Sequence, residues 1–175
     1  MRQSKPIMET ISKLKQSGYM VEILAMAVKK EISELGIVER YEKQKEQFGA
    51  GRWTPLSSHD VAYENMPNTL EQIESSLPVD RVRVFTRSHR CLYDNRPDAS
   101  KEVRKPPAAT QAILEERIRP LSKDELQDLK MAWECLFIMQ AARRAAGEEC
   151  RIVRKNLMEL NETGEVNNKD LGRGS

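Results

Sequence analysis

The sequence lacks any long hydrophobic run. No stretch approaches the ~18 to 20 consecutive apolar residues that a membrane-spanning helix requires, and the opening MRQSKPIMETISK has no apolar segment of the secretory type. We therefore expect no membrane association and a cytoplasmic or nuclear location. Basic and acidic residues number 29 and 27, and this near balance argues against a disordered polyelectrolyte, which combines low hydrophobicity with high net charge.

Cysteine and histidine are scarce. The three cysteines, Cys91, Cys135 and Cys150, are an odd number with wide, irregular spacing, which does not fit a disulfide framework. The only histidines are His59 and His89. A structural zinc site needs four nitrogen or sulfur ligands, usually in closely spaced pairs, and the sequence offers no second pair beside His89 and Cys91. We therefore predict no metal site.

The motifs of common catalytic sites are also missing. The sequence contains no P-loop, no G-x-G-x-x-G, no G-x-S-x-G and no H-E-x-x-H. Cys91 and His59 can be written as a nucleophile and base, but with only two histidines this pairing carries almost no information. We predict no catalytic residue and no cofactor, and we favour a non-enzymatic protein; an enzyme with a cleft around Cys91 is the third option.

What the sequence does contain is helical periodicity. Pro6 and apolar residues at helical spacing predict a helix over 6–17 that Gly18 ends. The nearly all-apolar stretch 20–28 predicts a buried core helix over 19–35. After Gly36, a polar helix is expected to end at Gly49, and we favour two helices over one interrupted at Gly36. Further segments are a loop over 49–68, a short helix over 69–77 and a helix that follows Pro107 and ends at Pro120.

One segment alternates with a period of two. Residues 79–87, VDRVRVFTR, place β-branched residues on one side and arginines on the other, which predicts a strand. Residues 90–93 form the second arm of a predicted hairpin around Ser88 and His89. Because an isolated hairpin is marginally stable in water, this one must pack on helices or pair with another chain.

The final helical pattern is the longest. Ser122 and Glu125 form a capping box, and apolar or small residues then recur every three or four positions to Leu160. An unbroken helix over 122–161 would be roughly 60 Å long at ~1.5 Å per residue, longer than the roughly 40 Å diameter of a compact domain of this size. Either it bends near Gly147 or its projecting end meets a partner helix. Its candidate interface residues are Trp133, Leu136, Val153, Leu157 and Leu160.

The predicted fold class is mainly α: a bundle of five to seven helices with a long C-terminal helix and a short β-hairpin near residues 80–93. We expect a single helical domain over 1–160, with candidate sub-boundaries at 49–68 and 94–106. Residues 161–175 have little to bury and are expected to form a flexible tail.

Positive charge is concentrated around the predicted hairpin. Residues 80–105 carry eight basic and four acidic side chains, a net +4 in a chain whose total is +2. Arginines that alternate along a strand share one face and suit phosphate contacts, and aromatic residues lie among them. The alternative is a solvated face, or one paired with acidic helices. The candidate nucleic-acid-binding residues are Arg81, Arg83, Phe85, Arg87, Arg90, Tyr93, Arg96, Arg104 and Lys105.

These features favour a helical, oligomeric, non-enzymatic protein that contacts nucleic-acid phosphates, as in RNA binding, with little sequence specificity. The alternative is a protein–protein interaction adaptor or chaperone-like subunit that docks through the long C-terminal helix. The expected partners are therefore nucleic acid and either a second copy of the chain or a partner helix.

Overall fold

The structure is a computed structural model that describes residues 4–76, 79–95 and 108–171. The chain divides into two compact units, each built from two separate stretches. Unit 1 combines residues 1–30 with 55–119, and unit 2 combines residues 31–54 with 120–175. Within the described ranges, no helix has both the length and the apolar character that a bilayer crossing demands.

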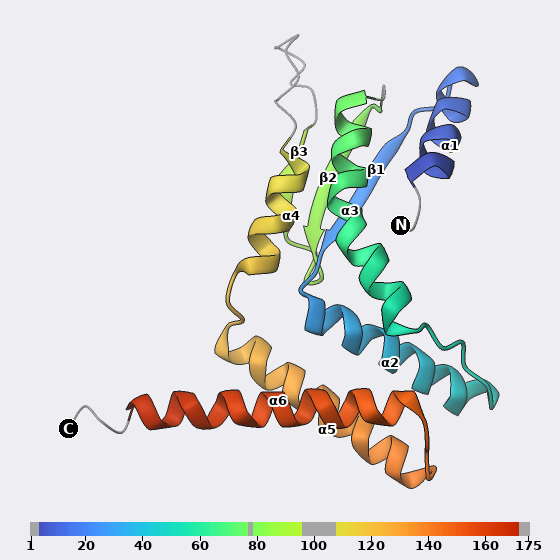
Figure 1. Cartoon of the computed structure of the whole chain (residues 1–175). Coiled ribbons are helices and arrows are strands. Elements are labelled where there is room, and N and C mark those ends of the chain that lie inside the picture. The colour runs from blue at the N-terminus through green and yellow to red at the C-terminus, as the bar shows by residue number, and fades with distance from the viewer. Residues whose placement is uncertain (1–3, 77–78, 96–107, 172–175) are drawn as a thin grey trace. The chain divides into compact units, whose positions relative to one another are not determined.

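Unit 1 is organised around a three-stranded mixed sheet with the strand order β1-β2-β3 (Figure 1). Strand β1 (Glu22–Ala27) runs parallel to β2 (Arg81–Thr86), with Glu22 opposite Arg81. Strand β3 (Cys91–Asp94) is antiparallel to β2. The predicted hairpin near residues 80–93 is thus confirmed, and its partner proves to be a strand of the same chain.

Strand β1 corrects the predicted core helix over 19–35. Ala25 and Ala27 are buried, whereas Leu24 and Met26 are 60% and 51% exposed, so burial alternates with a period of two. A run of apolar residues suits a buried helix or a strand equally well when one sequence is read alone. The parallel partner β2, which lies far along the chain, decides between them.

Three helices of unit 1 pack against one face of the sheet (Figure 1). They are α1 (Ser4–Gln16), α3 (Leu56–Ser76) and α4 (Ala109–Ile118), and the predicted helices at the positions of α1 and α4 are confirmed. Their buried apolar residues form one core with the inward side chains of β1 and β2. The central members of this core are Leu70, Ile73, Val82, Val84 and Ile113, each with no exposed surface.

Helix α3 overturns the loop predicted over 49–68, because the helix begins at Leu56 and continues through Pro67. A proline inside a helix removes the hydrogen bond to the carbonyl four residues earlier. That carbonyl belongs to Tyr63, and it accepts a hydrogen bond from Arg117 Nη2 at 3.0 Å instead. Pro67 itself is buried, and its own carbonyl accepts a bond from the Thr110 hydroxyl at 3.1 Å. Tertiary contacts therefore compensate for the proline.

Unit 2 consists of helical segments from both of its stretches. Helix α2 (Lys30–Phe48) begins at the last residue of unit 1 and runs through Gly36 without a break, so the preferred division into two helices is wrong. It ends at Gly49, whose φ of 72° is the left-handed conformation that favours glycine, as predicted. The other helices are α5 (Lys123–Ala142) and α6 (Glu148–Leu171).

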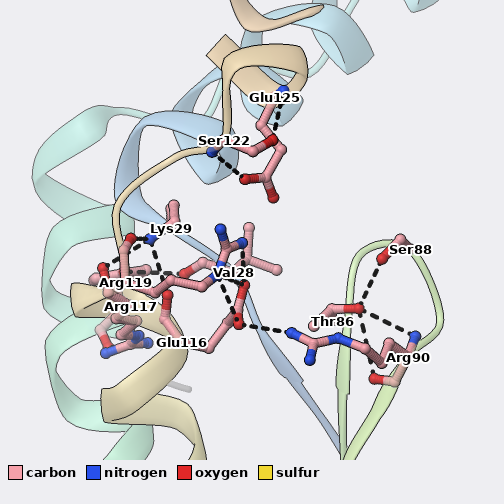
Figure 2. Close-up of polar contacts among 11 residues, drawn as sticks. Val28, Lys29, Thr86, Ser88, Arg90, Glu116, Arg117, Arg119, Ser122 and Glu125 are labelled. Carbon is pink, nitrogen blue, oxygen red and sulfur yellow. Dashed lines mark hydrogen bonds and ion pairs between the residues drawn. The ribbon is translucent and has the colours of Figure 1, made fainter.

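The predicted single long C-terminal helix is also wrong, because residues 143–147 separate α5 from α6. The predicted capping box is confirmed: Ser122 Oγ accepts from the Glu125 main-chain N–H, and the Glu125 carboxylate accepts from that of Ser122 (Figure 2). Helix α6 continues to Leu171, beyond the start of the tail predicted over 161–175. The fold class therefore changes from a helical bundle to an α/β fold in which the described residues form six helices and one mixed sheet.

Candidate phosphate-binding site

The carboxyl ends of β1 and β2 meet at one edge of the sheet because the two strands are parallel. Ligands of open α/β sheets bind at such an edge. Here, Lys29 follows β1, and Thr86 is the last residue of β2. Figure 2 shows the polar side chains of unit 1 that gather around these two positions.

Lys29 is buried, with only 3% of its surface exposed. Its Nζ donates to the carbonyl oxygen of Glu116 at 3.0 Å and also contacts those of Arg117 and Arg119. These carbonyls lie at the end of α4, where a helix has no intrahelical donors left and carries partial negative charge. Lys29 therefore caps the C-terminal end of α4.

The Glu116 carboxylate is the counter-ion of the same region. Glu116 is only 8% exposed, and its carboxylate oxygens contact Arg90 Nη2 at 3.2 Å and Arg119 Nη2 at 2.7 Å. The edge thus contains several cations, but each one named here already has an oxygen partner in the chain. Its charges stabilise the junction between α4 and the hairpin rather than present a free phosphate-binding surface.

The predicted arginine face of the hairpin is similarly occupied. Arg81 forms a two-pronged contact with Asp94, 2.9 Å from Nε and 2.6 Å from Nη2, and this hydrogen bonding raises the pKa of Arg81 above its usual value. Arg83 Nε lies 2.6 Å from the Glu22 carboxylate, and its guanidinium lies 5.3 Å from the centre of the Phe85 ring. The acidic partners are thus on the neighbouring strands of the same sheet.

The other predicted phosphate contacts fall in several places. Arg87 is exposed at the hairpin turn, and the Tyr93 hydroxyl donates to the buried Glu74 carboxylate at 2.5 Å. Arg96, Arg104 and Lys105 lie outside the described residues. The hairpin region therefore presents a surface whose cations are mostly neutralised within the chain.

The predicted interface residues divide into two groups. Trp133, Leu136 and Val153 are buried within unit 2, at 0%, 4% and 0% exposure, so other residues of the chain already cover them. Leu157 and Leu160 on α6 are half-buried. The apolar stripe thus contributes to the core of this chain.

A different pair of arginines lies on α2 and on the loop that follows it, all within unit 2. After Gly49 the chain turns back along the helix. The main-chain N–H of Arg52 donates to Gln44 Oε1 at 2.9 Å, and Arg40 Nη2 donates to the Thr54 hydroxyl at 3.1 Å. Arg40 and Gln44 are four residues apart, about one helical turn. The loop therefore places Arg52 one turn along α2 from Arg40.

Tight packing fixes this loop. A Cβ on Gly51 would lie 2.5 Å from the Tyr41 carbonyl oxygen, so only glycine permits the approach. The Trp53 ring packs edge-on against the Tyr41 ring, with 5.2 Å between centroids, and Trp53 Nε1 donates to Glu148 at 3.1 Å. The backbone on both sides of Arg52 is thereby held in place.

Arg40 and Arg52 are exposed, and neither forms an ion pair with a carboxylate of the described residues. Two guanidinium groups on a fixed loop and helix suit the bidentate binding of phosphate oxygens. Sequence reasoning missed them because residues 37–48 were interpreted only as a polar helix and 49–68 only as a loop. The sequence feature that could have pointed to this site is the close spacing of Gly49, Gly51 and Arg52.

The fold and this arginine pair define an α/β protein with a candidate site for phosphate groups. Comparison with known proteins identifies the family to which this chain belongs. Residues 1–98 match the family described as Zeta toxin, and the chain belongs to that family. Toxin zeta of Enterococcus hirae is 30% identical over 121 residues, which cover 68% of this chain and 40% of that protein. Toxin PezT of Streptococcus pneumoniae is 28% identical over 89 residues, covering 50% and 35%.

A solved structure of the PezAT chromosomal toxin–antitoxin system of Streptococcus pneumoniae has a similar fold. The TM-score is 0.65 at 22% identity, and the match covers 79% of this chain and 52% of that one. The chain spans about 40% of the length of the curated toxin zeta relatives.

Family membership corrects the function predicted from the sequence. The prediction of a non-enzymatic, RNA-binding helical protein is wrong, and so is the adaptor or chaperone-like alternative, because the chain belongs to the Zeta toxin family and its curated relatives are toxins. The neutralised arginines of the hairpin agree with this correction. The comparisons also give no support to nucleic acid as a partner.

Proposed function

We propose that this chain forms part of a toxin of a toxin–antitoxin system and that its activity is phosphoryl transfer from a nucleoside triphosphate. In this proposal, Arg40 and Arg52 bind phosphate oxygens. Membership of the Zeta toxin family supports the first part. The observation that carries the second is the fixed, exposed arginine pair one helical turn apart on α2 and its returning loop.

The chemistry of phosphoryl transfer explains why such a pair is useful. The transferred group carries negative charge on its equatorial oxygens, and catalysis depends mainly on positioning and charge stabilisation. Guanidinium groups remain charged at every physiological pH and offer paired N–H donors. Because Gly51 and Trp53 pack the loop against Tyr41, the backbone that carries Arg52 is already in place before a phosphate binds.

A protein partner belongs to the same proposal. The similar solved structure is of a toxin–antitoxin system, and we propose that the partner of this chain is an antitoxin. Co-expression with a candidate antitoxin, followed by gel filtration, tests this part. A stable complex is expected, and two separate peaks at micromolar concentration would contradict it.

Binding of phosphate is tested by calorimetric titration of the chain with ATP and with tripolyphosphate. We expect Arg40→Ala and Arg52→Ala each to weaken binding about tenfold, since a hydrogen bond to a charged group contributes about 1.5 to 3 kcal/mol. The matched control is Lys43→Ala, which removes an exposed cation from the same helix outside the pair. Equal affinity of all three variants and the parent would contradict the role of the two arginines.

Phosphoryl transfer itself is tested with ATP labelled in its γ-phosphate and an extract of bacterial small metabolites as acceptors. The expected result is a labelled metabolite that depends on the chain and is lost in Arg40→Ala and Arg52→Ala but retained in Lys43→Ala. Inducible expression in bacteria provides the cellular test. The parent chain and Lys43→Ala should arrest growth, whereas Arg40→Ala and Arg52→Ala should not. Label transfer that is unchanged in both arginine variants would leave the arginine pair without a role.

A further inference from the structure

A groove lies between α5 and α6, both in unit 2, and its lining includes neither Arg40 nor Arg52. It contains a hollow of about 220 Å³ whose apolar lining is formed by Phe137, Ala141, Ala145 and Cys150. Small residues at three of these positions leave the space open. Phe137 is 42% exposed, and its neighbour Ile138 is 66% exposed, so the apolar surface continues outside the hollow.

The size of the hollow indicates what it can hold. Sites for small molecules usually measure about 300 to 1,000 Å³. At about 220 Å³ this hollow is smaller, and it lies along a groove between two helices. Such a groove suits a single apolar side chain presented by a helix, in the way that amphipathic helices bind apolar grooves.

Two arginines border the hollow and give it a charge preference. Arg144 and Arg154 both line it and are exposed, and neither forms an ion pair with a carboxylate of the described residues. Arg143 differs, because it contacts Glu42 at 2.8 Å and Glu149 at 3.3 Å. A net positive rim around an apolar floor complements an acidic partner.

Cys150 and Arg154 line the same hollow, so the positive rim and the apolar floor are parts of one surface. Burial is the main cause that raises the pKa of the Cys150 thiol, and Glu149 raises it further, whereas Arg143 and Arg154 act in the opposite direction.

The position of Arg144 is unusual in itself. The turn after α5 has the two hydrogen bonds of a Schellman motif, from Ala145 N to Gln140 O at 2.9 Å and from Arg144 N to Ala141 O at 3.1 Å. The residue in the left-handed position of this motif is normally glycine, but here it is Arg144, with φ of 52°. The arginine side chain is thus present at a position where glycine would favour folding.

We propose that the α5–α6 groove docks an acidic amphipathic helix of a partner protein. One apolar side chain of that helix enters the hollow, and carboxylates on either side of it pair with Arg144 and Arg154. This inference is independent of the proposed phosphoryl transfer, since it uses none of the residues assigned to phosphate binding.

The probe is a fluorescent 16-residue helical peptide with leucines along one face and glutamates beside them, titrated against the full chain by anisotropy. We expect saturable binding that weakens with added salt. Arg144→Gly should raise the urea midpoint of unfolding while weakening binding about fivefold, the size expected for loss of one exposed ion pair of about 1 kcal/mol. Arg154→Gln should weaken binding similarly, and the matched control Arg151→Gln, exposed on α6 outside the hollow, should not.

A thiol assay locates the peptide. In a Cys91→Ser, Cys135→Ser background, the peptide should slow modification of Cys150, whereas it should not slow modification of Cys135 in the converse variant. The proposal is overturned by absence of binding at low salt, by equal binding of a peptide with lysines in place of the glutamates, or by unchanged affinity of Arg144→Gly and Arg154→Gln. Displacement of the peptide by a single-stranded oligonucleotide, or a dimer that Arg144→Gly dissociates, would assign the groove to another occupant.

Discussion

Arg117 donates through Nη2 to the main-chain carbonyl of Tyr63 at 3.0 Å, and its guanidinium carbon lies 3.6 Å from the centre of the Tyr63 ring. This is the carbonyl that loses its helical donor because Pro67 has no N–H. One side chain of α4 thus satisfies the backbone defect of α3 and also stacks on the aromatic ring. The contact ties α3 to α4 on the covered face of the sheet.

The first prediction concerns this contact. Arg117→Ala should lower the free energy of unfolding by about 3 kcal/mol, from the loss of a charged hydrogen bond and a cation–π contact. In a Pro67→Ala background the restored N–H can serve the Tyr63 carbonyl, so the same substitution should cost at least about 1 kcal/mol less. Urea unfolding of the four proteins measures this coupling, and strictly additive losses would refute it.

Gly51 tests the fixed loop of the candidate phosphate-binding site. Gly51→Ala places a Cβ 2.5 Å from the Tyr41 carbonyl oxygen, so the loop must shift. We expect a loss of about 1 to 3 kcal/mol in stability, in the range of overpacking, together with weaker ATP binding. Gly49→Ala, where nothing lies within 4 Å of the added atom, should cost about 1 kcal/mol for its left-handed backbone and leave ATP affinity nearly unchanged. Calorimetry and urea unfolding distinguish the two variants.

Glu42 predicts an acid-sensitive step in unfolding. Burial alone would raise the pKa of its carboxyl, but hydrogen bonds from Arg143 and Gln140 and the charge of Arg143 outweigh burial and lower the pKa below 4.5. The stability from this pair is therefore complete above pH 4.5 and is lost as the pH falls through the lowered value. Glu42→Gln should cost about 3 kcal/mol at pH 7 and flatten the acid limb of stability measured by urea unfolding. An acid limb identical to that of the parent would contradict this assignment.

Tyr93 predicts a loss of folding stability at alkaline pH. Burial and the hydrogen bond to Glu74 raise the pKa of its phenol to about 12. In the unfolded chain the phenol ionises near its ordinary value of about 10, so stability should decline as the pH rises from about 10 to about 12. Tyr93→Phe should reduce this decline and remove the last phenol to ionise in absorbance titration at 295 nm. A titration in which all tyrosines ionise together near pH 10 would count against the contact.

The sequence allowed the local elements with strong signals to be predicted. The helix ended by Gly18, the hairpin with its alternating arginines, and the capping box of Ser122 and Glu125 all depend on residues close together in the chain. The strand β1 and the helix through Pro67 depend on distant partners. An all-apolar run becomes a strand only beside β2, and a helical proline is tolerated because Arg117 replaces the missing donor.

The candidate site was less predictable. Alternation along residues 79–87 located a row of arginines, but the pairing of Arg81 with Asp94 and of Arg83 with Glu22 requires the register of the sheet. Conversely, Arg40 and Arg52 are twelve positions apart in the sequence, and they lie along the same helix only because the loop returns along α2. Charge counting along the chain does not distinguish a neutralised arginine from an available one.

The parallel pairing of β1 with β2 has a consequence for synthesis of the protein. The chain must extend from Glu22 to Arg81 before these strands can meet, and residues 31–54 of that interval belong to the other unit. Translation proceeds at about 5 to 20 residues per second, so β1 leaves the ribosome on the order of 3 to 12 seconds before its partner strand. During that time its apolar side chains have no sheet to join, and exposed apolar surface and unpaired strand edges of this kind favour aggregation.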